Sequence, residues 1–345
     1  MKQINTILPR FKKKNLTVFA GLNPMFQYLA YNLNIFDLLD QQVLFKKKKK
    51  YYTKADYFKI LFVFFLIGFE RIKHVLLLAQ DQFVLRFLTL SRIVMPENIV
   101  RCFLANSTVK HTYQLGQVNG NLLKKKHQKI ITKLTNGYCI IDCDSTTRDT
   151  HGHQEASGKH YKNHNGYHPI MAFIYQTEEF LHGYLRPGKT YTGNSIVEFL
   201  SESLMRLPYS INTILFRADS GFFYQYAFQL LEKLNHFYLV ADKLHKPLMQ
   251  RILQIPDKAY RLFSEEEGYK KEITVIHYQL PSWDKSRKLV IVRTVKDISD
   301  QLTFDGLNIE YTYRVYCTNL LLAAEEIVLC YQQRGNSENY IKEIK

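Results

Sequence analysis

Apolar residues are spaced differently in two parts of this chain, and the difference predicts two kinds of structure. Between residues 22 and 135 they recur at three- and four-residue intervals, so that Ile60, Val63 and Phe64 share one helical face. From Gly137 onward the pattern changes to short, dense apolar runs that end in polar or acidic residues. The chain is therefore expected to be an α/β protein whose N-terminal domain is helical.

The order of the elements after residue 137 predicts a mixed sheet. Strands are expected at residues 138–144, 168–175, 180–185, 213–216 and 236–241, with helices at 194–207 and 224–234. Three sequential strands followed by alternating helices and strands indicate a ribonuclease-H-like mixed sheet. Further strands without helices between them predict an inserted β-rich subdomain at about residues 243–319, and a final helix follows from about residue 323.

The excess of basic residues changes the expected partner but not the expected fold. The chain carries a formal charge of +16 at pH 7, and basic residues gather at 10–14, 46–50 and 124–126. This surplus favours a polyanionic partner such as nucleic acid or an anionic membrane surface. The alternative is a solvated basic surface without a partner. For the lysine run at 46–50, a solvated loop and a contact to the DNA backbone are equally compatible.

The sequence indicates neither a membrane protein nor a secreted one. The longest apolar run, Ile60–Phe69, has half of the roughly 20 residues that span a bilayer. The N-terminus lacks the charge, apolar run and cleavage site of a signal peptide. Five scattered cysteines without a C-x-x-C pair indicate reduced thiols. We therefore expect a soluble, cytoplasmic protein with no membrane partner.

Two acidic motifs follow predicted strands, at the edge where α/β sheets usually bind ligands. Asp142 and Asp144 lie two residues apart and therefore face the same way, with Asp144 at the end of its strand. Asp219 follows the strand at 213–216 and precedes a small-residue turn. Hard cations such as Mg²⁺ bind carboxylate oxygens, and a strand end fixes the backbone of such a ligand. Each motif alone is weak, because an acid that follows a strand is ordinary.

A third motif is predicted on the last helix, where an acid is combined with basic and aromatic residues. Tyr331, Arg334, Glu338 and Lys345 have offsets of 0, 3, 7 and 14 residues. At about 100° per residue they project within an arc of roughly 60°. Such a stripe suits one carboxylate that holds metal and basic groups that contact DNA phosphates. The alternative is a solvated helix face, and Gly335 disfavours a stable helix by roughly 1 kcal/mol.

Taken together, the three motifs resemble those of a known family. Asp144-Ser-Thr after a strand, Arg217-Ala-Asp-Ser-Gly-Phe, and Tyr331-x2-Arg-x3-Glu-x6-Lys345 are similar to the motifs of DDE transposases of bacterial insertion sequences. Within the IS-four superfamily, the sequence is most similar to the IS-thirteen-eighty family, and the last motif matches that family's pattern at all its positions. The resemblance extends from about residue 20 to the end and includes the β-rich insertion.

The resemblance implies a division of roles among these residues. Asp144, Asp219 and Glu338 would be catalytic and would bind two Mg²⁺ ions, for which Mn²⁺ would substitute. Residues 1–20 would be a basic arm, residues 21–136 a helical DNA-binding domain, and residues 137–345 the ribonuclease-H-like catalytic domain. Contacts to DNA are expected from Tyr331, Arg334, Lys345, Arg217 and Trp283.

The resemblance also implies an activity and its partners. A transposase of this kind binds the terminal inverted repeats of its element and catalyses metal-dependent strand cleavage and strand transfer. Water attacks first and frees a 3′-OH, which then attacks the target DNA without a covalent enzyme intermediate. Both ends must be held together, which implies a homodimer in the synaptic complex. The expected location is the bacterial cytoplasm, in association with the nucleoid.

Two other functions are compatible with the same acids. A ribonuclease-H-like nuclease that cuts without joining would have the same triad, but the Tyr/Arg/Lys spacing around Glu338 would be unexplained. Members of the family usually continue beyond the last helix. A C-terminally truncated remnant that binds DNA without cutting it is therefore the other alternative.

Two further features allow more than one interpretation. A zinc site is conceivable in the segment 151–168, but the segment has no cysteine and its Gly, Asn and Lys content is typical of a loop, so contact with DNA is favoured. Trp283 or Tyr278 would stack on a flipped base, whereas packing in the core of the insertion is the favoured interpretation. The histidines of the segment are His151, His153, His160, His164 and His168.

Overall fold

The computed structural model contains two compact units, Met1–Leu122 and Leu123–Lys345. The predicted basic arm (apart from residue 19), the lysine run at 46–50, His153 and Lys345 lie outside the residues that the structure describes. The described residues are 19, 21–44, 52–90, 92–93, 96–134, 137–152, 154–191, 193, 195–266, 268–297 and 309–344.

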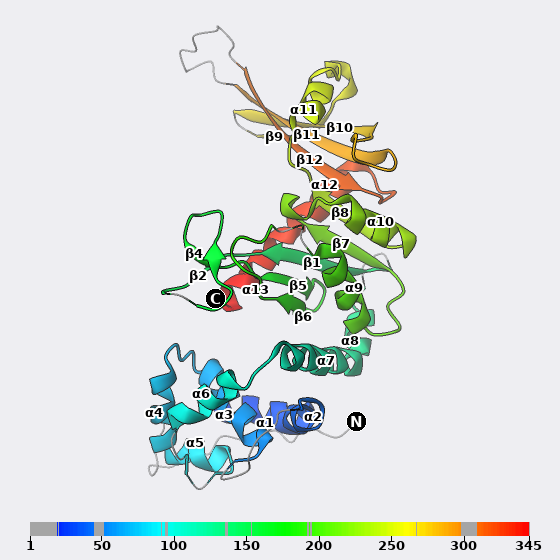
Figure 1. Ribbon diagram of the computed structural model, residues 1–345. Coiled ribbons are helices and arrows are strands. Elements are labelled where there is room, and N and C mark those ends of the chain that lie inside the picture. The colour runs from blue at the N-terminus through cyan, green and yellow to red at the C-terminus, as the bar shows by residue number, and fades with distance from the viewer. Residues whose placement is uncertain are drawn as a thin grey trace. The chain divides into compact units, whose positions relative to one another are not determined.

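The first unit is helical, as its spacing of apolar residues predicts (Figure 1). Its helix α3 begins with a capping box, in which Thr53 and Asp56 each accept a hydrogen bond from the other's backbone amide. Ile60 and Val63 of α3 are fully buried in the core of this unit. The elements are α1 (Leu22–Gln27), a π-helical turn η1 (Tyr28–Asn32), α2 (Ile35–Gln42), α3 (Lys54–Leu66), η2 (Ile72–His74), α4 (Val75–Gln80), α5 (Gln82–Phe87), α6 (Pro96–Ala105) and α7 (Val109–Lys125).

Helix α7 crosses the boundary between the two units. Its Asn119-Gly120-Asn121 sequence would be expected to interrupt a helix, yet α7 is continuous. Val118 is buried in the first core and Leu123 in the second, so packing outweighs the weak helix propensity between them. The boundary between the compact units, after Leu122, therefore comes before the domain boundary expected after residue 136.

The second unit is built on a mixed sheet whose strand order matches the predicted ribonuclease-H-like arrangement. β1 pairs antiparallel with β5, which pairs antiparallel with β6. On its other side β1 is parallel to β7, and β7 is parallel to β8. The predicted α/β fold class is therefore confirmed. These strands are β1 (Cys139–Ser145), β5 (Ile170–Ile174), β6 (Glu179–Tyr184), β7 (Ile214–Ala218) and β8 (Phe237–Ala241).

The predicted β-rich insertion contains the expected strands, but they extend the main sheet rather than forming a separate one. β12 pairs antiparallel with β8, so that Cys317 lies opposite Val240. Among the described residues, nine strands form one sheet in the order β6-β5-β1-β7-β8-β12-β11-β10-β9. The insertion contains α11 (Lys246–Leu253), η4 (Asp257–Ala259), β9 (Arg261–Glu266), β10 (Tyr269–Tyr278), β11 (Arg287–Asp297) and β12 (Ile309–Thr318).

Helices cover both faces of this sheet (Figure 1). On one face, α9 (Ile196–Arg206) and α10 (Gln225–Lys233) pack on a core that includes Ile141 and Phe216. On the other face lie α12 (Ala324–Gln332) and α13 (Asn336–Ile344). A single final helix was expected, but the 3₁₀ turn η5 (Gln333–Gly335) separates the two, at the glycine that disfavours a helix.

The remaining elements of the second unit are two short helical segments and a small sheet. α8 (His127–Ile131) follows α7, and η3 (Ser220–Phe222) follows β7. A small antiparallel sheet is formed by β2 (Arg148–Asp149), β4 (Asn165–Tyr167) and β3 (Gly158–Lys159). In the described part of the chain, none of the helices has both the length and the apolar character that crossing a bilayer requires.

The buried ring of His182 in β6 predicts a loss of stability in acid. The ring stacks on Phe199 with centroids 4.8 Å apart, and burial together with Arg206 lowers its pKa from 6.5 to about 4. Between these two values the unfolded chain binds a proton that the folded chain does not, so the free energy of unfolding falls as pH is lowered through this window. At about 1.4 kcal/mol per pKa unit, the loss attributable to this ring is about 3 kcal/mol.

Urea denaturation of wild type and His182→Phe between pH 7 and pH 4 measures this loss, because the variant has nothing to titrate at this position. We expect its stability to fall less steeply with acid than that of wild type. His151→Gln, which changes an exposed histidine, is the control and should keep the wild-type slope. Equal slopes for wild type and His182→Phe would show that this ring is not responsible.

Candidate active site

Two carboxylates lie at the same edge of the sheet because their strands are parallel neighbours. Asp144 is the residue before the last one of β1, and Asp219 comes directly after β7. The carboxyl ends of parallel strands meet at one edge, which is where ligands bind in such sheets. The turn after β7 holds Asp219 in place, since its Oδ1 accepts a hydrogen bond of 2.9 Å from the amide of Gly221.

The C-terminal helices carry Arg334 and the third predicted acid, Glu338. Arg334, in the 3₁₀ turn η5, is only 8% exposed, and its Nη2 lies 3.2 Å from Oδ1 of Asp144. The same nitrogen donates to the carbonyl of Cys143 at 3.4 Å. Glu338 lies one turn further on, exposed in the first turn of α13. The structure therefore brings residues from the first and last parts of the second unit together.

The charges around Asp144 act on its carboxyl group. Its pKa is raised, first by burial and then by the charges of Asp219 and Glu338, while Arg334 and the amide of Ser145 act to lower it. Asp144 is therefore next to one guanidinium and is repelled by two other carboxylates, a repulsion that Arg334 neutralises only in part. Carboxylate oxygens are the ligands that hard divalent cations prefer. By their chemistry these acids fit a divalent metal ion, but among the described residues their oxygens do not all lie within 4.8 Å of one another, as the ligand atoms of Asp149, His160 and His164 do.

The other predicted residues of the helical motif have different surroundings. Tyr331 is half-buried at the end of α12, its ring packs on Tyr316 with centroids 4.5 Å apart, and burial raises its pKa to about 12. Arg334 was expected to bind a phosphate, and in this structure its guanidinium is directed at Asp144. The stripe predicted for one exposed helix face is therefore part buried, because η5 turns Arg334 toward the sheet. The DNA contacts of Tyr331 and Arg334 stay predictions.

Two residues predicted to contact DNA are in the protein core instead. Arg217 is 0% exposed and forms a two-point ion pair with Asp142. Trp283 is 6% exposed and packs between Phe223 and Phe228. In this structure both side chains are buried away from the surface, and their contacts to DNA stay predictions. For Trp283 the structure shows the packing interpretation that the sequence also allowed.

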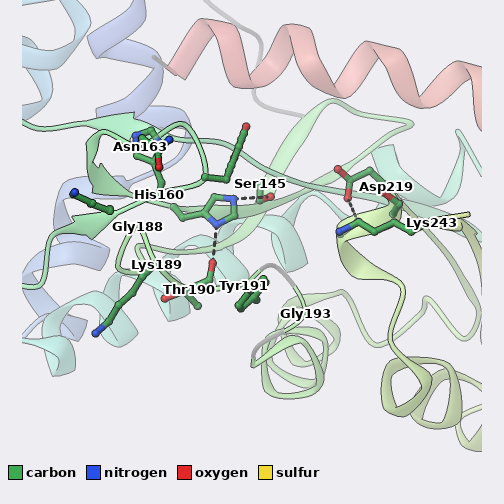
Figure 2. A pocket seen from close by; sticks show the side chains of 15 residues that line it. Ser145, His160, Asn163, Gly188, Lys189, Thr190, Tyr191, Gly193, Asp219 and Lys243 are labelled. Atoms are coloured by element: carbon green, nitrogen blue, oxygen red, sulfur yellow. Dashed lines mark hydrogen bonds between the residues drawn. The ribbon is translucent and has the colours of Figure 1, made fainter. Parts of the chain in front are cut away.

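A pocket of about 570 Å³ is lined by Asp219 and by Ser145, the residue after Asp144. Figure 2 shows Asp219 and Lys243 toward one end of it and His160 and Asn163 toward the other. In its wall, the buried ring of His168 lies 3.1 Å from Oγ of Ser145, the residue after Asp144. The segment 151–168 therefore lies beside the candidate active site. The lining also includes cationic and aromatic side chains, namely Lys159, Lys189, Tyr161 and Tyr191.

Two histidines of this segment converge on one acid. Nε2 of His160 lies 2.7 Å from Oδ1 of Asp149, and Nδ1 of His164 lies 3.0 Å from Oδ2. These atoms are close enough to hold a metal ion. The amide of Lys162, however, donates to Nδ1 of His160, which leaves Nε2 as the protonated nitrogen of the neutral ring. The cluster is therefore satisfied as a hydrogen-bonded network, in which His164 and His160 lower the pKa of Asp149.

Two residues that follow β8 also belong to this region and were not predicted from the sequence. Asp242 and Lys243 come directly after this strand, and β8 is the parallel neighbour of β7. Lys243 lines the pocket together with Asp219. The Asp242 carboxyl is buried, which raises its pKa to about 7. The signal that could have found them is their place at a third parallel strand end, which is the same signal that identified Asp144 and Asp219.

Comparison with known protein families gives a match that covers most of the chain. The family described as Transposase DDE domain group 1 matches residues 25–345, a range that includes Asp144, Asp219 and Glu338. No curated protein matches the chain. Among solved structures, the chain is similar to piggyBac transposase in a synaptic complex with hairpin DNA, with a TM-score of 0.48 and 9% sequence identity. The match covers 93% of this chain and 67% of that chain.

Proposed function

The chain belongs to the DDE transposase family, domain group 1, and we propose that it cuts DNA at the ends of a mobile element and joins those ends to target DNA. The family implies an enzyme of the polynucleotidyl transferase or nuclease kind that uses divalent metal ions. The observation that supports the finer proposal is that Asp144 and Asp219 lie at the ends of two parallel neighbouring strands, with Arg334 of the helical motif 3.2 Å from Asp144. The element is proposed to be a bacterial insertion sequence of the IS-four superfamily, nearest the IS-thirteen-eighty family.

The three acids are proposed to hold two Mg²⁺ ions. When bound, these ions supply charge neutralisation at the scissile phosphate and a more acidic water. Asp144 and Asp219 present their oxygens from fixed strand ends, so little reorganisation accompanies binding. Glu338 adds a carboxylate from α13, and Arg334 holds Asp144 in place through the 3.2 Å contact. Preorganised charge of this kind is how such sites stabilise a phosphoryl transition state.

The partners of the reaction follow from its chemistry. Hydrolysis at an element end frees a 3′-OH, and the same acids then serve its attack on a second strand. DNA is the proposed partner for the positive charge of +16, and terminal inverted repeats are its proposed binding sites. A homodimer is proposed for the complex that holds both ends.

Cleavage and joining of end-labelled DNA test this proposal. The substrate carries the two ends of the element that encodes the chain, and the reaction is run with Mg²⁺, with Mn²⁺ and with EDTA. We expect cut and joined products with either ion and none with EDTA, since phosphoryl transfer requires the ions. Cutting without joining would identify a nuclease instead, and end-specific binding without cutting would identify a DNA-binding protein.

A further inference from the structure

A buried ion pair lies directly behind the candidate active site. Asp142 in β1 and Arg217 in β7 are opposite each other in the register of the two strands, and both are 0% exposed. Nε of Arg217 donates to Oδ1 of Asp142 at 2.7 Å, and Nη2 donates to Oδ2 at 2.8 Å. The guanidinium also lies 4.4 Å from the centre of the Tyr175 ring. Two strands of the sheet are thus tied together two residues before Asp144.

The same guanidinium reaches the C-terminal helices. Nη1 of Arg217 donates to the backbone carbonyl of Cys330 at 2.5 Å. Cys330 lies near the end of α12, and in a continuous α-helix its carbonyl would accept a hydrogen bond from the amide of residue 334. The chain instead passes into the 3₁₀ turn η5 at residues 333–335. Arg217 therefore holds the helical segment at a carbonyl three residues before this turn begins.

The turn carries the residue of the helical motif that contacts an acid. Arg334, four residues after Cys330, points at Asp144 across 3.2 Å. Beyond η5, α13 packs on the sheet face that carries Asp142 and Asp144, with the ring of Tyr340 5.6 Å from that of Phe173. In the register of the sheet, Phe173 lies opposite Asp142. Contacts thus connect the buried pair to the end of α12 and the sheet to α13, the helix that carries Glu338.

We propose that Arg217 and Asp142 are positioning residues for the reaction: they fix the Cys330 carbonyl and thereby direct Arg334 and Glu338 to Asp144 and Asp219. This inference rests on the proposed function. The alternative is that the pair only fills the core. Apolar residues fill a core as well as a buried ion pair does, often with equal or greater stability. A planar guanidinium, in contrast, can bind a carboxylate with two nitrogens and a carbonyl with a third.

The double variant Asp142→Leu/Arg217→Met separates these two roles. It removes both charges together, so no unpaired charge is left in the core, and it removes the donor to Cys330. The matched control is Glu272→Leu/Arg293→Met, which removes another cross-strand acid–arginine pair, in β10 and β11. The readouts are the thermal unfolding midpoint, hydrogen exchange of residues 331–344, Mn²⁺ binding followed by electron paramagnetic resonance, and the rate of DNA cleavage.

A positioning role predicts a change in the site without a loss of the fold. In Asp142→Leu/Arg217→Met the unfolding midpoint should stay at or above that of wild type, while Mn²⁺ affinity and cleavage rate each fall by about 10- to 100-fold. Exchange at 331–344 should be faster, and the control should change neither exchange nor Mn²⁺ affinity. The proposal would be overturned by a stable double variant whose hydrogen exchange, Mn²⁺ affinity and cleavage rate equal those of wild type. If the wild-type protein does not cut DNA, the proposed function fails. Hydrogen exchange of residues 331–344 and the Mn²⁺ affinity then still show whether Arg217 and Asp142 are positioning residues.

Discussion

Replacing Asp219 by asparagine is expected to reduce Mg²⁺-dependent DNA cleavage by about 10³-fold or more, because one metal ligand contributes several kcal/mol to the transition state. Asparagine is nearly isosteric and keeps the oxygen that accepts from the Gly221 amide, so the turn after β7 should stay intact. DNA binding should change little, since binding relies on phosphate contacts elsewhere. Single-turnover cleavage rates and a gel-shift titration, measured on the same DNA, check both parts.

The control for this prediction is an acid on a strand that is separated from β7 by four other strands of the sheet. Glu265 is exposed on β9, and Glu265→Gln removes the same charge without touching the site. It should cut DNA at the wild-type rate, which shows that the loss in Asp219→Asn is not a general effect of net charge. Cleavage by Asp219→Asn at more than a tenth of the wild-type rate would remove Asp219 from the catalytic residues.

Replacing Asp142 alone by alanine is expected to lower the free energy of unfolding by about 3–5 kcal/mol. The change leaves Arg217 fully buried without its carboxylate partner, and a buried unpaired charge is far more costly than a missing ion pair. Urea denaturation followed by the fluorescence of Trp283, which is buried in the same unit, measures the loss.

The double variant that removes both charges gives the internal comparison for this prediction. Asp142→Leu/Arg217→Met should be at least as stable as wild type and so recover all the stability that Asp142→Ala loses, because no charge remains in the core. If the single variant is as stable as wild type, the guanidinium must reach another partner or water, and the description of this pair as closed to solvent is wrong.

The strand ends of the candidate site could be predicted from the sequence because their pattern is local. A dense apolar run that ends in an acid places that acid at a sheet edge, which held for Asp144 and for Asp219. The order of strands and helices then gave the mixed sheet, since connection rules leave few arrangements for such an order. The position of Glu338 relative to these acids came from the family resemblance, because no local pattern relates residues so far apart.

The surroundings of single side chains could not be predicted in this way. Arg217 stands in a motif with Asp219, which favoured a DNA contact, but its partner Asp142 is set by strand register, a property of the folded sheet. The continuation of the sheet through β12 depends likewise on a pairing between residues 317 and 240. The turn of Arg334 toward Asp144 depends on η5, whose only local signal is Gly335.

The central claim is that Asp144, Asp219 and Glu338 together bind divalent metal ions, and anomalous scattering from Mn²⁺ tests it most directly. Crystals of the wild-type chain with DNA ends, soaked in Mn²⁺, would be measured beside crystals of Asp219→Asn. The account predicts anomalous peaks among these three carboxylates in wild type and weaker or fewer peaks in the variant. The absence of peaks there, or a peak only at Asp149, His160 and His164, would contradict it.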